Sequence, residues 1–349
     1  MKAIRIHGAN DVRISEMDQP KPGPGQVLLR VLATGICGTD VEIFDGVMAY
    51  FVRGMASYPV TPGHEWVGEV VECGEGVEGL HPGQRAVGEC SVGCMACPTC
   101  LAGNYHQCPN RTETGILNRD GGFAEYILFP ALFLHPISES VDPRAAALVE
   151  PTAIAYNGVK NADISPSDRL VIHGDGPIGL LVLQVAKAFG AQSIAMVGGT
   201  PARLDLARTL GADVTINALA EDVAAKLAEF GNGRMPNKAI EATGIPQAAA
   251  TALTAIEPGG TVVLQGLFGG RLLDGFDLDQ IVINDLSVKG ALGSPGIWPD
   301  VIKMIEQGRV DPLAIVSHSL SLDQFEQGIG MVKNHEGIKL VVTQTETAS

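Results

Sequence analysis

Positive charge, charged residues in general and long hydrophobic runs are all scarce in this sequence. The 349 residues include 24 Lys and Arg against 39 Asp and Glu, which gives a formal net charge of −15. Proteins that bind nucleic acid or anionic membranes need clustered Lys and Arg, so we expect neither partner. No apolar stretch approaches the roughly 18–20 residues of a membrane span, and the first residues form a strand-like pattern instead of a signal peptide. These absences predict a soluble, cytoplasmic protein.

The overall composition is that of a folded protein. Charged residues make up 18% of the chain and hydrophobic residues 46%, a balance that argues against intrinsic disorder. A single hydrophobic core rarely grows beyond about 250–300 residues, so the length predicts two domains. The 43 glycines lie between apolar segments, which is typical of many tight turns joining strands and helices.

Four of the seven cysteines follow a C-x2-C-x2-C-x7-C spacing in a loop-like segment. They are Cys94, Cys97, Cys100 and Cys108. Three thiolates three residues apart, with a fourth returned by a turn at Gly103, can surround one ion, and four sulfur ligands are typical of structural zinc. Two disulfides are the alternative, which a reducing compartment disfavours. Cys73 and Cys90 lie outside this set and are interpreted as small buried apolar residues.

Cys37 belongs to a second candidate metal site. It stands in the segment GICGTD, and His64-Glu65 and later Glu150 follow along the chain. A thiolate, an imidazole and one or two carboxylates, with a position left for water or substrate, describe a catalytic zinc site. Each residue alone has an ordinary interpretation, as a structural histidine or a surface acid. Their joint meaning depends on the second half of the chain.

That second half contains a nucleotide-binding pattern. The apolar run Arg169–His173 predicts a buried strand. It leads into Gly174-Asp175-Gly176-Pro177-Ile178-Gly179 and then an apolar helix over 180–189, which is G-x-G-x-x-G between strand and helix. The first glycine permits a tight turn, the second lets the backbone approach a pyrophosphate, and the third allows close helix–strand packing. The helix N-terminus then offers its N–H groups to the phosphates.

The same alternation continues beyond the fingerprint. Repeated strand–helix units predict a parallel, doubly wound α/β sheet. The expected elements are strands near 193–197, 214–216, 238–241, 261–265 and 286–289, and helices near 201–210, 221–230 and 247–256.

The residues at the end of the second strand indicate whether the cofactor is NAD or NADP. NAD-binding proteins usually place Asp or Glu there, about 20 residues beyond the fingerprint. Here the segment 197–201 holds no acid, and Gly198 leaves room for a 2′-phosphate that Thr200, Arg203 and Arg208 can contact. The pattern favours NADP, with NAD also usable. Arg203 as a solvated residue of the first helical turn is the alternative.

Asp175 is unusual within the fingerprint because a carboxylate beside a pyrophosphate weakens binding. We expect its side chain to turn to solvent. In the alternative its charge opposes the cofactor, so that Asp175→Asn binds the dinucleotide more tightly.

Taken in order, these motifs resemble one family along essentially the whole chain. The motifs are GICGTD around Cys37, Gly63-His64-Glu65, the four-cysteine loop, GGFAEY at 121–126, Val149-Glu150-Pro151 and the glycine fingerprint. The family is the zinc-dependent medium-chain dehydrogenases/reductases. The resemblance implies a mainly-β GroES-like catalytic domain, residues 1–155 and 291–349, and a Rossmann domain, residues 156–290. The loop 164–168 is a plausible boundary segment.

The resemblance also implies roles for individual residues. Cys37 and His64 are direct ligands of a catalytic zinc, and Glu65 or Glu150 is the further ligand, exchanging with water. Thr39 takes the substrate's hydroxyl proton. Glu150 stands where alcohol dehydrogenases proper often have cysteine, which resembles the polyol, sugar and threonine dehydrogenase branch.

Many members of the family have histidine at the position of Glu42. Glu42 is interpreted as the outer end of a proton relay, a substrate contact or a surface acid, and glutamate here resembles microbial glucose dehydrogenases. A sugar, polyol, cyclitol or aminocyclitol is the expected substrate. An apolar secondary alcohol or an amino-acid alcohol such as threonine is the alternative.

Two other classes are considered. A non-enzymatic nucleotide-binding protein would keep the glycine fingerprint but lose the zinc site, so Cys37, His64 and Glu150 together count against it. A zinc-free quinone or enoyl reductase of the same fold would lack both zinc sites. Metal analysis separates these interpretations, since only a zinc-dependent dehydrogenase should contain two zinc ions per chain. We also expect a homodimer or homotetramer, in which late strands near 260–266 and 286–290 pair across subunits.

Overall fold

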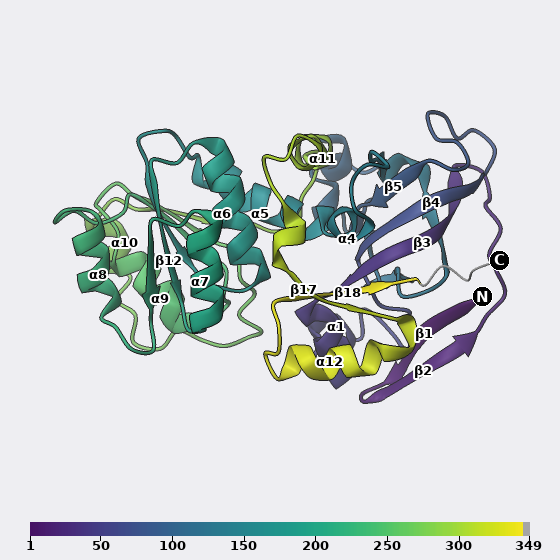
Figure 1. The fold of residues 1–349 in the computed structure, drawn as a ribbon, viewed down its shortest axis with the longest axis horizontal. Coiled ribbons are helices and arrows are strands. Elements are labelled where there is room, and N and C mark those ends of the chain that lie inside the picture. The colour runs from purple at the N-terminus through teal and green to yellow at the C-terminus, as the bar shows by residue number, and fades with distance from the viewer. Residues whose placement is uncertain (345–349) are drawn as a thin grey trace. The chain divides into compact units, whose positions relative to one another are not determined.

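The computed structural model describes residues 1–344 and divides the chain into two compact units (Figure 1). The first contains Met1–Glu150, Gly293–Glu306 and the described residues from 311 to 344, and the second contains Pro151–Leu292 and Gln307–Val310. No helix among the described residues combines the length and apolar character needed to cross a bilayer.

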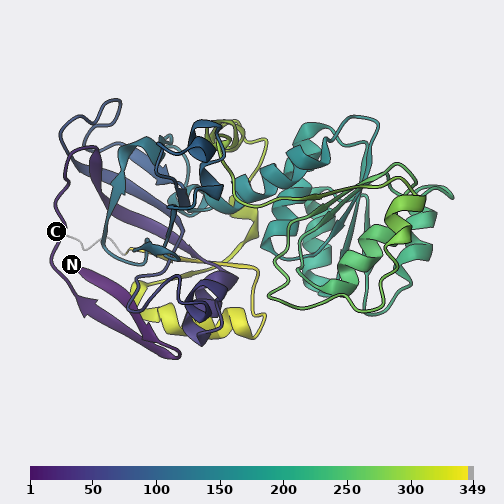
Figure 2. The same cartoon turned by 180° about the vertical axis from the view of Figure 1, so that it is seen from behind.

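The second unit is built on a six-stranded parallel sheet in the order β13-β12-β11-β14-β15-β16. Figure 2 shows helices covering both faces of this sheet. The strands are β11 (Arg169–His173), β12 (Ser193–Gly198), β13 (Val214–Asn217), β14 (Lys238–Glu241), β15 (Thr261–Leu264) and β16 (Ser287–Gly290). The helices are α6 (Pro177–Phe189), α7 (Pro201–Leu210), α8 (Val223–Phe230), α9 (Pro246–Thr254) and α10 (Asp279–Ile283). The predicted doubly wound α/β fold is confirmed.

Burial explains why these segments take these forms. Leu170, Val171 and Ile172 of β11 are fully buried, as a strand covered on both faces requires. Helix α6 ends at Gly190, whose φ of 90° is the left-handed conformation that favours glycine at a helix C-terminus.

The first unit is mainly β. Its seven-stranded sheet has the order β10-β5-β4-β3-β18-β17, with β9 also paired to β3, and two smaller sheets join β1 to β2 and β6-β7-β8. The strands are β1 (Lys2–Gly8), β2 (Asp11–Glu16), β3 (Gln26–Ile36), β4 (Glu65–Cys73), β5 (Arg85–Gly88), β6 (Ser91–Val92), β7 (Thr112–Thr114), β8 (Asn118–Arg119), β9 (Tyr126–Pro130), β10 (Leu134–Pro136), β17 (Val316–Leu320) and β18 (Lys339–Thr343). The α-helices are α1 (Gly38–Asp45), α2 (Ala49–Val52), α3 (Pro98–Leu101), α4 (Pro143–Ala147), α11 (Trp298–Glu306) and α12 (Phe325–Lys333), and α5 (Val149–Ala162) contains the boundary at Glu150.

The C-terminal part of the chain completes the central sheet of the first unit. Strand β18 pairs antiparallel with β3, with Leu340 opposite Ile36. Residues about 300 positions apart therefore lie side by side at the end of β3, where the candidate metal ligand Cys37 follows.

Candidate active site and metal centres

The end of β3 and the start of β4 bring the first predicted ligands together. Gly35 lies opposite Glu65 in the antiparallel pair, so Cys37, two residues further along, comes beside the Gly63–His64 segment that precedes β4. A Cβ at Gly35 would collide with the Glu65 side chain. Glycine at this position therefore allows the carboxylate to reach the site.

The three side chains form a group able to hold a cation. The Cys37 sulfur, a His64 ring nitrogen and a Glu65 oxygen all lie within 4.8 Å of one another. His64 and Glu65 are only 5% and 1% exposed, yet His64 Nδ1 has no hydrogen-bond partner among the described residues. Buried polar atoms are normally satisfied, so this ring nitrogen fits a metal ion. Sulfur, nitrogen and oxygen are the donor set of catalytic zinc.

Electrostatics in the site agree with this assignment. Burial alone would lower the pKa of His64, but the Cys37 thiolate, with Asp40 and Glu150, raises it well above the usual value. Negative charge is thus concentrated around the imidazole, and a dication would neutralise that charge.

Glu150 is close to this group but not part of it. It is buried near the start of α5, and its charge acts on His64, yet the compact group contains Glu65 instead. Burial raises the pKa of Glu150 to about 7. Of the two predicted carboxylate ligands, the geometry therefore favours Glu65. Thr39 also lies at the site, with its Oγ1 3.9 Å from the Cys37 sulfur.

Asp40 is a site residue to which the sequence analysis assigned no role. It is fully buried; its Oδ2 accepts a hydrogen bond from the Cys37 backbone N–H at 2.8 Å, and its Oδ1 accepts one from the Gly63 N–H at 3.1 Å. One carboxylate therefore joins the two segments that carry the ligands. The clue in the sequence was its position three residues after Cys37, because an acid there can accept a hydrogen bond from the backbone N–H of the residue that caps a helix.

Replacing Asp40 with alanine is expected to lower the free energy of unfolding by about 2–4 kcal/mol, because two buried N–H groups lose their acceptor. Urea unfolding measures this loss. Asp45→Ala is the matched control, since Asp45 ends the same helix in a surface ion pair with Lys333 that is worth roughly 0–1 kcal/mol. Equal losses in the two variants would contradict the joining role.

Lys339 is a second residue that the sequence did not reveal. Its Nζ lies 2.6 Å from the Glu65 carboxylate, donates a hydrogen bond to Oε1 and donates another to the Ile36 carbonyl at 2.9 Å. Burial would lower the pKa of Lys339, but the Glu65 carboxylate raises it above the usual value. Lys339 thereby fixes the orientation of Glu65. No local pattern could have shown this, because 274 positions separate the two residues.

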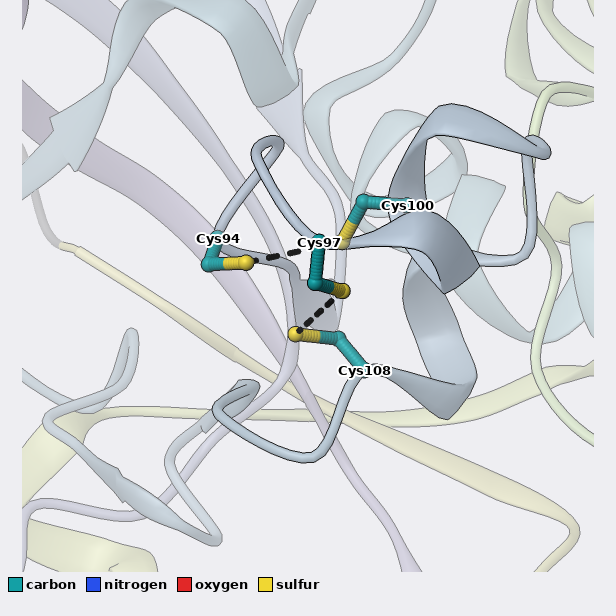
Figure 3. A group of neighbouring side chains, drawn as sticks. All are labelled: Cys94, Cys97, Cys100 and Cys108. Carbon is teal, nitrogen blue, oxygen red and sulfur yellow. Dashed lines mark hydrogen bonds between the residues drawn. The ribbon is translucent and has the colours of Figure 1, made fainter.

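The four cysteines of segment 94–108, the cysteine lobe, lie close together, as predicted (Figure 3). The sulfurs of Cys94 and Cys100 are 3.9 Å apart and those of Cys97 and Cys108 are 3.8 Å apart. Zn–S bonds of about 2.3 Å in a tetrahedron place sulfurs about 3.8 Å apart, so the geometry fits zinc. All seven cysteines are free thiols in the structure, which opposes the alternative of two disulfides.

The thiol pKa values show that the lobe requires a cation to hold four thiolates. The backbone N–H groups of Ala96 and Cys97 lower the pKa of Cys94 to about 6, whereas burial raises that of Cys100 to about 12. Four thiolates cannot gather here without a cation. Zinc supplies the positive charge that makes the fully deprotonated cluster stable.

The glycine fingerprint takes the form expected of a phosphate-binding turn. Gly174 has a φ of 124°, and a Cβ at Gly179 would collide with the Gly174 carbonyl. Gly176 is the N-cap of the 13-residue helix α6, and a Cβ there would meet nothing within 4 Å. The helix N-terminus thus has open space in front of it, which fits a pyrophosphate. Pro177 and Ile178 form the first turn of α6.

Asp175 differs from expectation. Its side chain does not turn to solvent, because Oδ2 accepts hydrogen bonds from the Gly199 N–H at 3.0 Å and the Thr200 N–H at 2.7 Å. Those N–H groups precede helix α7 and attract a carboxylate more strongly than water does. Of the other predicted cofactor contacts, Gly198 ends β12, Thr200 is the N-cap of α7, and Arg203 lies in its first turn.

Comparison with known proteins adds a family context. Residues 23–139 match the alcohol dehydrogenase GroES-like domain, and residues 177–307 match the zinc-binding dehydrogenase family. L-threonine 3-dehydrogenase of Pyrococcus horikoshii is 35% identical over 98% of this chain and 97% of its own length. Sorbitol dehydrogenase of Halalkalibacterium halodurans is 31% identical over 98% and 99%. A solved structure from Sinorhizobium meliloti, bound to NADP, superposes with a TM-score of 0.90 at 30% identity, covering 98% of each chain.

Proposed function

Because the chain belongs to the zinc-dependent medium-chain dehydrogenase/reductase family, we propose that it interconverts a polyhydroxylated secondary alcohol and its ketone. It is a zinc-dependent alcohol dehydrogenase that uses NAD or NADP and acts on a small molecule. The proposed substrate is a sugar, polyol, cyclitol or aminocyclitol. The observation that carries the proposal is the buried Cys37–His64–Glu65 group, in which the ring nitrogen His64 Nδ1 has no hydrogen-bond partner among residues 1–344.

The protein's own residues divide the work of the reaction. Cys37, His64 and Glu65 would hold the catalytic zinc, and Glu150 is the carboxylate that would exchange with Glu65. When bound, zinc would supply the Lewis-acid polarisation that lowers the pKa of the substrate hydroxyl. Thr39 accepts the hydroxyl proton through its Oγ1. Lys339 and Asp40 keep the ligands in place through the contacts described above.

One domain binds the zinc ions and the substrate, and the other binds the dinucleotide. We assign residues 1–155 and 291–349 to the catalytic domain and residues 156–290 to the nucleotide-binding domain. The six-stranded sheet, which lies wholly within 169–290, supports the second assignment. Gly174, Gly176 and Gly179 bind the pyrophosphate there, and Cys94, Cys97, Cys100 and Cys108 hold a structural zinc in the first domain.

A polar cluster of Arg111, Glu113 and Tyr50 supports a substrate with several hydroxyl groups. Arg111 donates to Glu113 Oε1 at 2.7 Å and to the Tyr50 hydroxyl at 2.9 Å. Burial raises the pKa of the Cys90 thiol well above the usual value, and the charges of Glu150 and Glu113 add to that effect. Glu113 and Glu150 therefore both act on the Cys90 thiol. A carboxylate, a guanidinium and a phenol can each bind a hydroxyl group.

Steady-state assays of sugars, polyols, cyclitols, threonine and simple secondary alcohols, each with NAD and NADP, test this proposal. We expect the highest kcat/KM with a polyhydroxylated substrate, and metal analysis should find two zinc ions per chain, one for each ligand group. The similarity to L-threonine 3-dehydrogenase makes threonine the second candidate. Highest activity with an unfunctionalised alcohol would overturn the assigned substrate class.

Glu42→Gln tests whether Glu42 ends the proton relay. Glu42 is exposed on α1, five residues after Cys37. If it passes the proton to solvent, kcat should fall about 10-fold at neutral pH and one limb of the pH–rate profile should move, since general bases contribute at least that much. Glu326→Gln, an exposed acid on α12, is the control for loss of charge. A profile unchanged in both limbs would leave Glu42 a substrate contact or a surface acid.

We also propose that the protein is a cytoplasmic homodimer or homotetramer. All four residues of the edge strand β16 are exposed, and an exposed edge is a pairing site. Large apolar side chains exposed in the same region add to this support; they are Leu267, Leu272, Leu278, Val282, Ile283 and Leu292. Sedimentation analysis that finds only monomers would reject the assembly.

A further inference from the structure

The end of strand β12 lacks the acid that normally distinguishes the two dinucleotides. In NAD-binding sheets, a carboxylate at the end of the second strand accepts hydrogen bonds from the adenosine ribose. Here the last residue of β12 is Gly198, and Gly199 and Thr200 follow it. On sequence alone this absence favours NADP.

The space beside Gly198 is nevertheless occupied by a carboxyl group. A Cβ placed on Gly198 would lie 2.5 Å from the Cβ, Cγ and Oδ2 of Asp175. The Asp175 side chain thus stands where a side chain at the end of β12 would begin. Two backbone hydrogen bonds, from Gly199 and Thr200 to Oδ2, hold it there.

We infer that Asp175, from the glycine fingerprint, is the ribose-binding carboxylate of this enzyme and makes it prefer NAD to NADP. This inference rests on the proposed dinucleotide-dependent function. Oδ2 accepts from the two backbone N–H groups, whereas Oδ1 accepts no hydrogen bond from any of residues 1–344. A carboxylate oxygen accepts more than one hydrogen bond, so Oδ1 is left to accept from the ribose 2′-hydroxyl.

The same geometry opposes a 2′-phosphate. The phosphate of NADP would lie next to the Asp175 carboxylate, and like charges at short range repel. The N–H groups of Gly199 and Thr200, which are suitable phosphate donors, already bind Asp175. Arg203 and Thr200 are therefore not sufficient to select NADP.

Direct binding measurements test the inference without relying on turnover. Dissociation constants of NADH and NADPH for the zinc-loaded protein, measured by calorimetry, should favour NADH at least about 10-fold, because a hydrogen bond to a charged group contributes about 1.5–3 kcal/mol. In Asp175→Asn, NADH should bind about 10-fold more weakly and NADPH no more weakly, so that the preference is lost. A residue that only stabilised the turn would weaken both dinucleotides equally, and that result would overturn the inference.

Two further variants sharpen the test. Glu229→Gln removes one charge from α8, where Glu229 pairs with Lys226 on the surface, and should leave the NADH/NADPH ratio unchanged. The double variant Asp175→Ala, Gly198→Asp moves the carboxylate to the end of β12 and should restore the NADH preference. Thermal unfolding of each variant verifies folding.

The outcomes separate the inference from the proposed function. A wild-type preference for NADPH, or a ratio that Asp175→Asn does not change, overturns the role of Asp175 and leaves the dehydrogenase intact. Failure of the folded, zinc-loaded protein to bind either dinucleotide overturns both.

Discussion

Replacing Cys37 with alanine is expected to remove the catalytic zinc and lower kcat/KM by at least about 1,000-fold, since Lewis-acid polarisation contributes several kcal/mol and each 1.36 kcal/mol is tenfold in rate. Cys37 is the only sulfur in its ligand group, with His64 and Glu65 as the other members. The two remaining donors hold the ion poorly because a catalytic zinc site normally has three protein ligands. Glu65 keeps its ion pair with Lys339, so the site should stay folded.

Metal analysis together with kinetics measures this effect. The variant should retain one zinc ion per chain, held by the cysteine lobe, with a thermal unfolding midpoint close to that of the wild type. Cys73→Ala is the matched control, because Cys73 lies at the end of β4 outside both ligand groups. If Cys37→Ala kept both zinc ions, the assignment of the catalytic site would be wrong.

Replacing Cys108 with alanine is expected to have its largest effect on stability. Cys108 is fully buried and packs in a core cluster with Val92, Tyr105 and Phe133. Structural zinc contributes apparent binding free energies of about 10–16 kcal/mol in small zinc domains, so loss of one ligand should cost more than about 4 kcal/mol of the free energy of unfolding. The lobe has little other regular structure to hold it, because α3 is four residues long.

Zinc content and chemical unfolding measure this loss, and chelation of the wild-type protein should reproduce it. The same Cys73→Ala variant controls for removal of a thiol. In Cys108→Ala the remaining zinc should be bound by Cys37, His64 and Glu65. The specific activity should therefore fall much less than the stability does, as long as the lobe stays folded. A variant with unchanged stability would show that the four cysteines serve another purpose.

Much of the nucleotide-binding unit was predictable from the sequence. The expected strand at Arg169–His173 and the expected helix at 201–210 coincide with β11 and α7. Short parallel strands are continuous apolar runs, and glycines or prolines mark their ends. Helix α8 begins at Val223, two residues later than expected, because Asp222 caps it by accepting from the Ala225 N–H.

The site was predictable only in part. Residue types and the family resemblance predicted Cys37, His64 and either Glu65 or Glu150 as ligands, and in the structure the ligand atoms of Cys37, His64 and Glu65 lie within 4.8 Å of one another. Asp40 and Lys339 were not identified, since their roles depend on contacts with distant segments. The position of Asp175 was predicted wrongly, because a local pattern cannot show that two N–H groups beyond the next strand point toward its carboxylate.

The sequence by itself determined the donor chemistry and the sheet. Cysteine spacing within a short loop, a glycine fingerprint and alternating apolar segments are local properties, so they can be read without coordinates. Only the tertiary structure decided which carboxylate lies beside Cys37 and His64, which lysine orients it, and that the Asp175 carboxylate lies at the end of β12. Those questions concern distances between residues far apart in the chain, and such distances are set by strand pairing and packing.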